Sequence, residues 1–199
     1  MKKLVEQDVY RHKKYKYMCL ILFGLLSIGI LAIISICSGN FKTSVSDVFC
    51  VLCNPKENLM LYKIITKSRC PRLIAALIVG AALSASGWVY QELFSNRMAS
   101  PDILGVSAGA GCGASTAILI GLSFSLTSIC AFISGLLTVG MTMLLSSTFK
   151  RNHNSISLIL SGIIMSGLSN SIMGIIKYIA NDTQLSTITF WLLGGFYNV

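Results

Sequence analysis

The sequence predicts an all-α membrane protein, a polytopic transmembrane helix bundle of about five helices plus the start of a sixth. Its 199 residues are 54% hydrophobic and only 12% charged, whereas soluble domains carry about 25% charged residues. The charged residues are also clustered, and a helix needs roughly 20 apolar residues to cross a bilayer. The uncharged runs cover residues 17–41, 73–91, 103–149, 154–176 and 183–199.

The lengths of these runs define the individual spans. The run 103–149 is long enough for two helices and a short turn, whereas the run 183–199 stops before it completes a span. The more polar segment 39–70 is interpreted as a loop with a short interfacial helix around 45–52. We therefore expect transmembrane helices over about 17–38, 71–93, 103–121, 125–149 and 156–179.

The composition of the first two spans predicts their surroundings. The first is rich in Leu and Ile and is expected to face lipid. Pro71 is placed in the first turn of the second span, where its missing N–H costs nothing. The second span has small residues on nearly every side. Small residues mark helix–helix contacts in membranes, so we expect this span to be the most buried helix.

The later spans carry glycine and polar patterns. Gly105, Gly109 and Gly113 follow an i, i+4, i+8 spacing along one helix face of the third span. The fifth span is unusually polar and includes Ser166 and Asn170. Because polar groups inside a membrane usually face a bundle interior or an aqueous cavity, this helix is predicted to line a pathway. Interhelical packing is the alternative interpretation.

The charge distribution predicts an orientation. The net charge is +9, and six of the sixteen cations lie in the basic arm 1–16 before the first span. Such an arm is typical of a cytoplasmic N-terminus and argues against nucleic-acid binding. Alternating spans then place 92–102 and 150–153 in the cytoplasm, and 42–72 and the segment after Lys177 outside. Nine cations lie inside and seven outside in this arrangement, which is a weak bias.

Several short motifs do not support catalysis. Gly105-Val106-Ser107-Ala108-Gly109 fits G-x-S-x-G, but that motif needs a strand–turn–helix setting and a later acid and histidine. The only histidine after the motif is His153. The sequence has no P-loop. Cys50 and Cys53 form a C-x-x-C pair without the second ligand pair of a zinc site, and are interpreted as incidental thiols. We predict no catalytic residue, metal ligand or cofactor.

Three ordered stretches carry a family resemblance. Arg69-Cys70-Pro71-Arg72 starts the second span, which ends near Gln91. The run Ser95 to Ala110 follows, and Phe190 to Phe196 forms the third stretch. In this order and spacing they resemble the FecCD-type permeases of ABC importers, which take up ferric siderophores, haem and cobalamin. The resemblance covers residues 17–199, interpreted as a partial transmembrane permease domain.

Two departures from the family pattern are visible. The family's Arg-Asn-Pro-Leu turn becomes Ser95-Asn96-Arg97-Met98, which loses a proline and shifts the arginine by two positions. This change is expected to loosen the inner turn or alter contacts with an ATPase. Family members are also considerably longer, and their ATPase-coupling loop lies beyond the sixth helix. The sequence is therefore interpreted as a fragment or a truncated gene product.

The resemblance implies partners and a location. It implies a bacterial inner or plasma membrane protein that pairs with a second permease chain, in a homo- or heterodimer. ABC ATPase subunits would dock inside and an extracytoplasmic substrate-binding protein outside. ATP hydrolysis is expected in a separate partner chain, so this chain is expected to be a transport subunit and not an enzyme.

The resemblance also assigns roles to particular residues. Arg69 and Arg72 are expected to dock the binding protein through acidic side chains, since guanidinium groups bind carboxylates in a fixed geometry; burial of their stems at lipid headgroups is the alternative. A short outer helix is expected at about 183–192. The inner turn motif comprises Gln91, Asn96, Ala99, Pro101, Gly105, Ser107 and Gly109. The pathway and outer mouth comprise Ser166, Asn170, Asn181, Asp182, Thr183, Trp191, Gly194 and Gly195.

Two other interpretations compete with an active permease. An unrelated polytopic secondary transporter would carry coupling charges within its spans, and the five predicted spans contain no Asp, Glu, Lys or Arg at the membrane centre. An inactive permease remnant is the other alternative. The cargo is not specified by these motifs.

Overall fold

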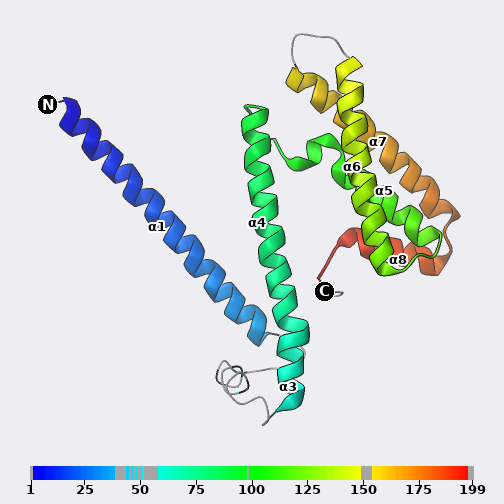
Figure 1. Ribbon diagram of the computed structural model, residues 1–199, viewed down its shortest axis with the longest axis horizontal. Coiled ribbons are helices and arrows are strands. Elements are labelled where there is room, and N and C mark those ends of the chain that lie inside the picture. The colour runs from blue at the N-terminus through cyan, green and yellow to red at the C-terminus, as the bar shows by residue number, and fades with distance from the viewer. Residues whose placement is uncertain are drawn as a thin grey trace. The chain divides into compact units, whose positions relative to one another are not determined.

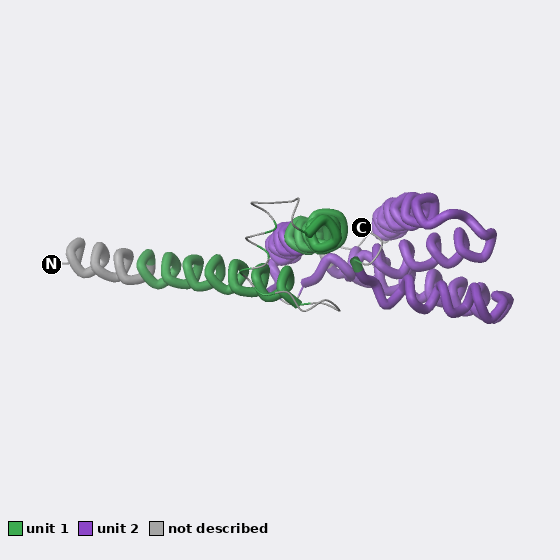
Figure 2. The backbone as a smooth tube through the Cα atoms, turned by 90° about the horizontal axis from the view of Figure 1, so that it is seen from below, with its two compact units in different colours: residues 1–78, 196–199 green, residues 79–195 purple. Residues whose placement is uncertain are grey.

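The computed structural model describes most of the chain as helix. The described residues are 2–38, 58–97, 99–148 and 154–196, together with 44, 46, 48 and 51. They contain no strand. The chain divides into two compact units, which Figure 2 distinguishes by colour. Unit 1 comprises residues 1–78 and 196–199, and unit 2 comprises residues 79–195.

Unit 1 is built from helices that meet at one small core. Helix α1 covers Lys2–Cys37, and α3 covers Leu59–Ile64. A single π-helical turn, η1 (Ile65–Arg69), joins α3 directly to α4 (Cys70–Leu93) (Figure 1). The core consists of Val48, Val51 and Ile65, against which the end of α1 packs.

Unit 2 contains α4 from Val79 onward and the later helices, labelled in Figure 1. A short 3₁₀ turn, η2 (Pro101–Leu104), precedes α5 (Val106–Leu119). Helices α6 (Phe124–Thr148) and α7 (Asn154–Ile179) pack against α5 and against each other. Helix α8 (Asp182–Leu193) also packs on α5.

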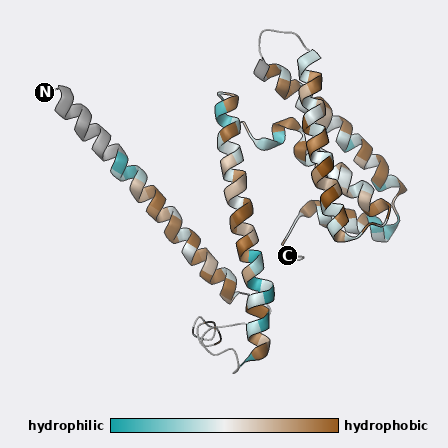
Figure 3. Cartoon of the chain, viewed as in Figure 1, coloured by the Kyte–Doolittle hydropathy of each residue, from teal (hydrophilic) through white to brown (hydrophobic). Residues whose placement is uncertain are grey.

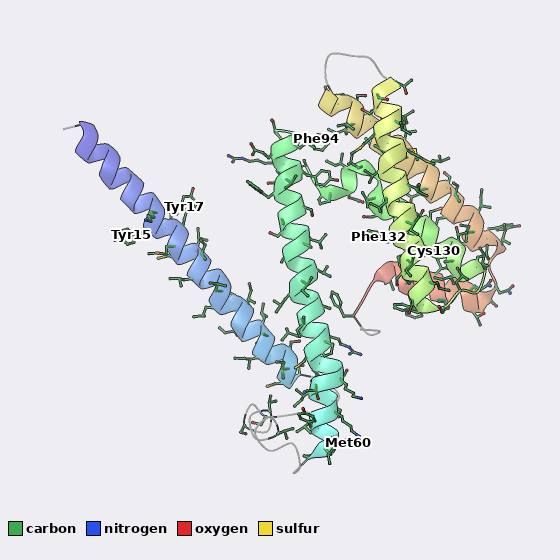
Figure 4. The ribbon with its side chains drawn as sticks, in the orientation of Figure 1. Tyr15, Tyr17, Met60, Phe94, Cys130 and Phe132 are labelled. Carbon is green, nitrogen blue, oxygen red and sulfur yellow. The ribbon has the colours of Figure 1, made fainter. Side chains whose placement is uncertain are left out.

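Four described helices are long and apolar enough to cross a membrane. Figure 3 shows their predominantly hydrophobic colouring. Among the described residues these helices cover Lys14–Cys37, Leu59–Leu93, Phe124–Thr148 and Ile156–Ile179. Aromatic side chains such as Tyr17 on α1 and Phe132 on α6 extend from the helices and are exposed (Figure 4). The polytopic helix bundle predicted from the sequence is therefore confirmed.

Two glycines allow α5 to approach α6 and α7 to approach η2 closely within unit 2. A Cβ on Gly113 would lie 2.4 Å from Cβ of Ser134 on α6. A Cβ on Gly162 of α7 would lie 1.9 Å from the carbonyl oxygen of Ile103. Because real Cβ atoms do not approach other atoms so closely, only glycine fits at these two contacts. Small residues at helix interfaces let helices approach closely and pack well within a bilayer.

Two predicted helix boundaries differ from the structure. Pro71 does not start a helix, because the helix already begins at Leu59 and continues through the π-turn. In this wide turn, Cys70 N–H donates to the Ile65 carbonyl. The helix then continues through Pro71 without a break. The predicted span 103–121 is also broken: Gly105 separates η2 from α5, whose 14 residues fall short of the length of a complete span.

The expected burial of the second span is not observed within this chain. No residue of α4 is buried. Nothing lies within 4 Å of a Cβ placed on Gly80 or Gly87. Small residues permit close approach, but they do not specify which helix approaches. In the described chain, the glycines of α5 and α7 make the close contacts instead.

Candidate functional site

The turn between α4 and α5 holds the predicted inner turn motif. Its backbone is closed by Asn96 N–H donating to the Gln91 carbonyl at 3.1 Å and by Ala99 N–H donating to the Asn96 carbonyl at 3.0 Å. Ala99 is buried in a cluster with Phe94 and Leu104, whereas Gln91 and Asn96 are exposed. Backbone hydrogen bonds therefore connect Gln91, Asn96 and Ala99. Of the three, Ala99 packs into the apolar cluster.

A break in the helical path follows this turn. Pro101 starts η2, and Gly105 adopts a left-handed φ of 76° that favours glycine. A Cβ at Gly105 would lie 2.8 Å from Ser166 Oγ on α7. Thr142 of α6 donates its hydroxyl to the Leu104 carbonyl at 3.1 Å in a buried hydrogen bond. A broken helix at membrane depth requires such internal partners for its backbone groups.

Helix α5 meets α6 at its next glycine. A Cβ at Gly109 would lie 2.0 Å from Thr138 Oγ1, and Ser134 donates to the Gly109 carbonyl at 2.8 Å. Gly109 and Gly113 therefore share one contact face, as their spacing predicts. Gly105 instead contacts α7, because it lies in the break before α5. Ser107, which lies on α5 between Gly105 and Gly109, is exposed.

The first turn of α8 is tied to the end of α5. Asn181 is the N-cap residue of α8, and its N–H donates to Gln184 Oε1 at 3.1 Å. Gln184 Nε2 in turn donates to the Leu119 carbonyl at 3.1 Å. One amide therefore satisfies a donor at the start of α8 and an acceptor at the end of α5. Asp182 occupies the first turn of α8 and is exposed.

A pocket of about 300 Å³ lies between α8 and the α5–α6 connection. Its lining includes two residues predicted at the outer mouth, Thr183 and Trp191. Aliphatic, aromatic, hydroxyl and amide groups form its walls, and no titratable side chain belongs to the lining. The remaining lining residues are Ile118, Gly121, Leu122, Phe124, Thr127, Gln184 and Thr187.

The other predicted pathway residues occupy different environments. Ser166 packs at the Gly105 break, whereas Asn170, one turn further along α7, is exposed. Gly194 ends α8 with φ 73° and donates its N–H to the Trp191 carbonyl at 3.1 Å. Gly195 follows in the exposed segment after the helix. The structure therefore does not gather these residues into one cavity within the described chain.

The two arginines of the docking motif have different surroundings. Arg69 Nη1 donates to the Ile36 carbonyl near the C-terminus of α1, and its side chain is half-buried. A cation at this position also complements the partial negative charge at a helix C-terminus. Arg72 is exposed. The docking role remains a prediction for both.

The sequence prediction did not identify Gln184 and Thr142. The Asn-x-x-Gln spacing at 181–184 was the available signal for a capping box, whereas nothing in the sequence marks Thr142 as the partner of Leu104. No cluster of His, Cys, Asp and Glu among the described residues could hold a metal ion. Cys50, Cys53 and the predicted cytoplasmic loop 150–153 lie outside the described residues.

The helices and their contacts define a polytopic α-helical membrane protein with a broken helix clamped between two others. The model of the FecCD transport family matches residues 25–199. The chain belongs to the FecCD transport family. The resemblance drawn from three short motifs is thereby confirmed.

Known relatives resemble the chain over most of its length. The molybdate import system permease protein MolB of Haemophilus influenzae is 36% identical over 88% of this chain and 54% of the relative. The vitamin B12 import system permease protein BtuC of Shigella boydii is 36% identical over 92% of this chain and 52% of the relative. The chain spans about half the length of these curated relatives.

A solved structure shares the fold. It is an inward-facing conformation of a metal-chelate type ABC transporter, with a TM-score of 0.75 and 34% identity. The match covers 89% of this chain and 54% of that chain. The helical arrangement described above is therefore similar to that of an experimentally determined transporter.

Proposed function

We propose that the chain forms part of the transmembrane permease subunit of an ABC importer that takes up a ferric siderophore, haem or cobalamin. The family match over residues 25–199 is the observation that carries this proposal. Relatives described as import permeases for vitamin B12 and molybdate support the transport role. The B12 permease supports cobalamin among the cargoes, and the metal-chelate transporter supports a chelated metal.

The proposed importer contains further chains. A second permease chain would complete the membrane part, ABC ATPase subunits would dock on its cytoplasmic side, and a substrate-binding protein would dock outside. We place the assembly in a bacterial inner or plasma membrane with the N-terminus of this chain in the cytoplasm. The basic arm before the first span supports that orientation.

The proposal assigns separate tasks to the described elements. The segment around Arg69 and Arg72 would lie at the docking face, and α8 with its pocket would flank the outer mouth. Helix α7 would line the pathway through Asn170, because an exposed amide in a membrane helix needs a polar neighbour or an aqueous cavity. The clamped break at Gly105 would hold α5 and α7 together as one moving body.

Transport in this arrangement requires no covalent chemistry from the chain. The described residues contain no candidate metal cluster, and the pocket lining offers no acid–base group. Movement of cargo would follow from rocking of helix bundles. The driving force would come from ATP hydrolysis in the partner subunits.

Uptake measurements on cells that produce the chain test this function. Its gene is deleted, and uptake of radiolabelled ferric siderophore, haem, cobalamin and molybdate is compared before and after complementation. Loss of uptake of one of the first three, restored by the gene, is the expected result. Loss of molybdate uptake alone would refute the proposed cargo, and unchanged uptake of every compound would refute the import function.

A further inference from the structure

Two cysteines that are distant in sequence meet at the small core of unit 1. Cys37 ends α1, and Cys70 begins α4. Both side chains are half-buried, and both pack against the core of Val48, Val51 and Ile65. These two residues, here called the outer cysteine pair, belong to the same compact unit.

A hydrogen bond beside the pair joins the two chain segments. Arg69 donates from Nη1 to the Ile36 carbonyl, and these two residues immediately precede Cys70 and Cys37. The Cys70 N–H donates to the carbonyl of the buried Ile65, which keeps Cys70 beside the core. The end of α1 therefore contacts the helix of α3, η1 and α4 at the place where both cysteines lie (Figure 1).

The lengths of the two helices place both cysteines at the same edge of a bilayer. Cys37 follows Lys16, the last cation before the first span, by 21 residues, about 31 Å of helix. Cys70 lies three residues before the uncharged run 73–91, which covers about 28 Å of helix. Since the hydrocarbon of a bilayer is about 30 Å thick, each thiol lies at the edge of the hydrocarbon, within reach of water.

The proposed orientation puts this edge on the extracytoplasmic side. Disulfides form and persist there, whereas thiols in the cytosol are kept reduced. We propose that Cys37 and Cys70 form a disulfide that joins the first two membrane helices covalently. The inference rests on the proposed function for its compartment, and on the contacts within unit 1 for the pairing itself.

Oxidation of the pair is a thiol–disulfide exchange. The oxidant is a protein disulfide or a small-molecule disulfide of the extracytoplasmic space. One cysteine thiolate attacks a sulfur of that disulfide and releases its first thiolate, and the second cysteine then displaces the other. The pair loses two protons and two electrons as its S–S bond forms, and the S–S bond of the oxidant is reduced to two thiols.

The disulfide anchors a helix that has few other attachments. None of residues 14–37 is buried, and lipid provides no hydrophobic force that would hold one helix against another. The end of α1 is held by the Arg69 hydrogen bond and by a core of three buried residues. A covalent bond at this end closes the segment 38–69 into a loop and keeps α1 beside α4.

Disulfide mapping in the intact chain tests the pair. Cells that produce the chain are grown with oxygen and quenched with acid, and their thiols are blocked with N-ethylmaleimide. The membrane fraction is digested and analysed by mass spectrometry without reductant. A peptide linked through Cys37 and Cys70 is expected from most of the chains, and it should disappear after reduction. Cys19, near the opposite edge of the first span, should carry maleimide and is the internal control.

Variants in isolated membranes treated with oxidised glutathione test the alignment of the two thiols. The exchange Cys37→Ser with Ser38→Cys keeps the composition and moves one thiol off the position that contacts the core. It should lower the yield of the linked peptide by about tenfold or more, because a disulfide tolerates little change in geometry. Arg69→Ala should slow bond formation several-fold, because the end of α1 loses its hydrogen bond. Arg72→Ala should leave the rate within about twofold.

The outcomes distinguish the pair from its setting. Absence of the linked peptide from cells and from oxidised membranes would overturn the inference, as would a bond from Cys37 or Cys70 to Cys50 or Cys53. Formation in isolated membranes alone would show adjacent thiols that the cell keeps reduced, and the proposed disulfide would be wrong. An equal yield after the exchange would contradict the alignment by the core. A linked pair in a chain whose deletion changes no uptake would refute the import function and leave the disulfide standing.

Discussion

Single glycines decide how closely the helices of unit 2 approach one another. At Gly162 the nearest atom to an added Cβ is the backbone oxygen of Ile103, whereas at Gly109 it is the side-chain oxygen of Thr138. A side chain can rotate away, but the backbone at Ile103 is held in the turn that precedes the Gly105 break. The two glycines therefore differ in how much a methyl group would cost.

Replacement of Gly162 by alanine should destabilise the bundle by about 2 kcal/mol, in the range found for overpacked cores. The added methyl group would displace the Ile103 backbone, with its carbonyl oxygen 1.9 Å from the new Cβ. Unfolding of the chain in mixed detergent micelles, followed by circular dichroism, measures the change. Gly167→Ala is the matched control, because nothing lies within 4 Å of its Cβ. A loss of stability as large in the control would contradict the contact.

The side-chain amide of Gln184 accepts one hydrogen bond and donates another. Replacing the amide by a carboxylate removes only the donated bond. The carboxylate of a Gln184→Glu variant would keep an oxygen for the Asn181 N–H but could not donate to the Leu119 carbonyl. We expect this substitution to lower stability by about 1 kcal/mol, the usual value of one hydrogen bond. The same unfolding assay applies. Gln91→Glu at the exposed end of α4 should stay within about 0.5 kcal/mol, and equal losses would argue against the role of Gln184.

At the scale of elements, the sequence predicted the long helices well and their irregular joints poorly. The predicted span 156–179 corresponds to α7, Asn154–Ile179, and the outer helix 183–192 to α8, Asp182–Leu193. Uncharged runs in the sequence suffice to predict such helices. The π-turn before Pro71 and the break at Gly105 depend on partners distant in sequence, and therefore escape a local pattern.

The contacts of the candidate site were likewise predictable from the sequence only in part. Motif spacing predicted the shared face of Gly109 and Gly113, which the structure confirms. It did not predict that Gly105 contacts α7, because that contact depends on the left-handed backbone between η2 and α5. Likewise, the small residues of α4 indicated close packing but could not identify its neighbour.

The joint between α1 and the π-turn gives a prediction about Arg69. Removal of its guanidinium leaves the Ile36 carbonyl without this donor, so the end of α1 should separate more often from the unit 1 core. In the reduced chain, Arg69→Ala should increase maleimide labelling of Cys37 and Cys70, both of which pack against that core, by several-fold. Peptide mass spectrometry after timed labelling measures the rates. Arg72→Ala is the control, and an equal increase in that variant would show that Arg69 has no special role.

For the whole molecule, orientation decides which proposed surfaces meet which partners. Residues 59–70 can dock a soluble extracytoplasmic protein only if they lie outside, and the turn between α4 and α5 can meet an ATPase only if it lies inside. The continuous helix Leu59–Leu93 connects these regions across about 50 Å at 1.5 Å per residue. This length is enough to cross a bilayer, and we predict that its two ends lie on opposite sides.

Cysteine labelling in intact cells tests the direction of this helix. With the seven native cysteines replaced by serine or alanine, Met60→Cys should react with a membrane-impermeant maleimide before cells are opened. Ser100→Cys should react only after permeabilisation. Both positions are exposed, so equal labelling in opened cells is the control for accessibility. The reverse pattern would place Arg69 and Arg72 in the cytoplasm, and the docking role proposed for them would then fail even if the fold and the family assignment stand.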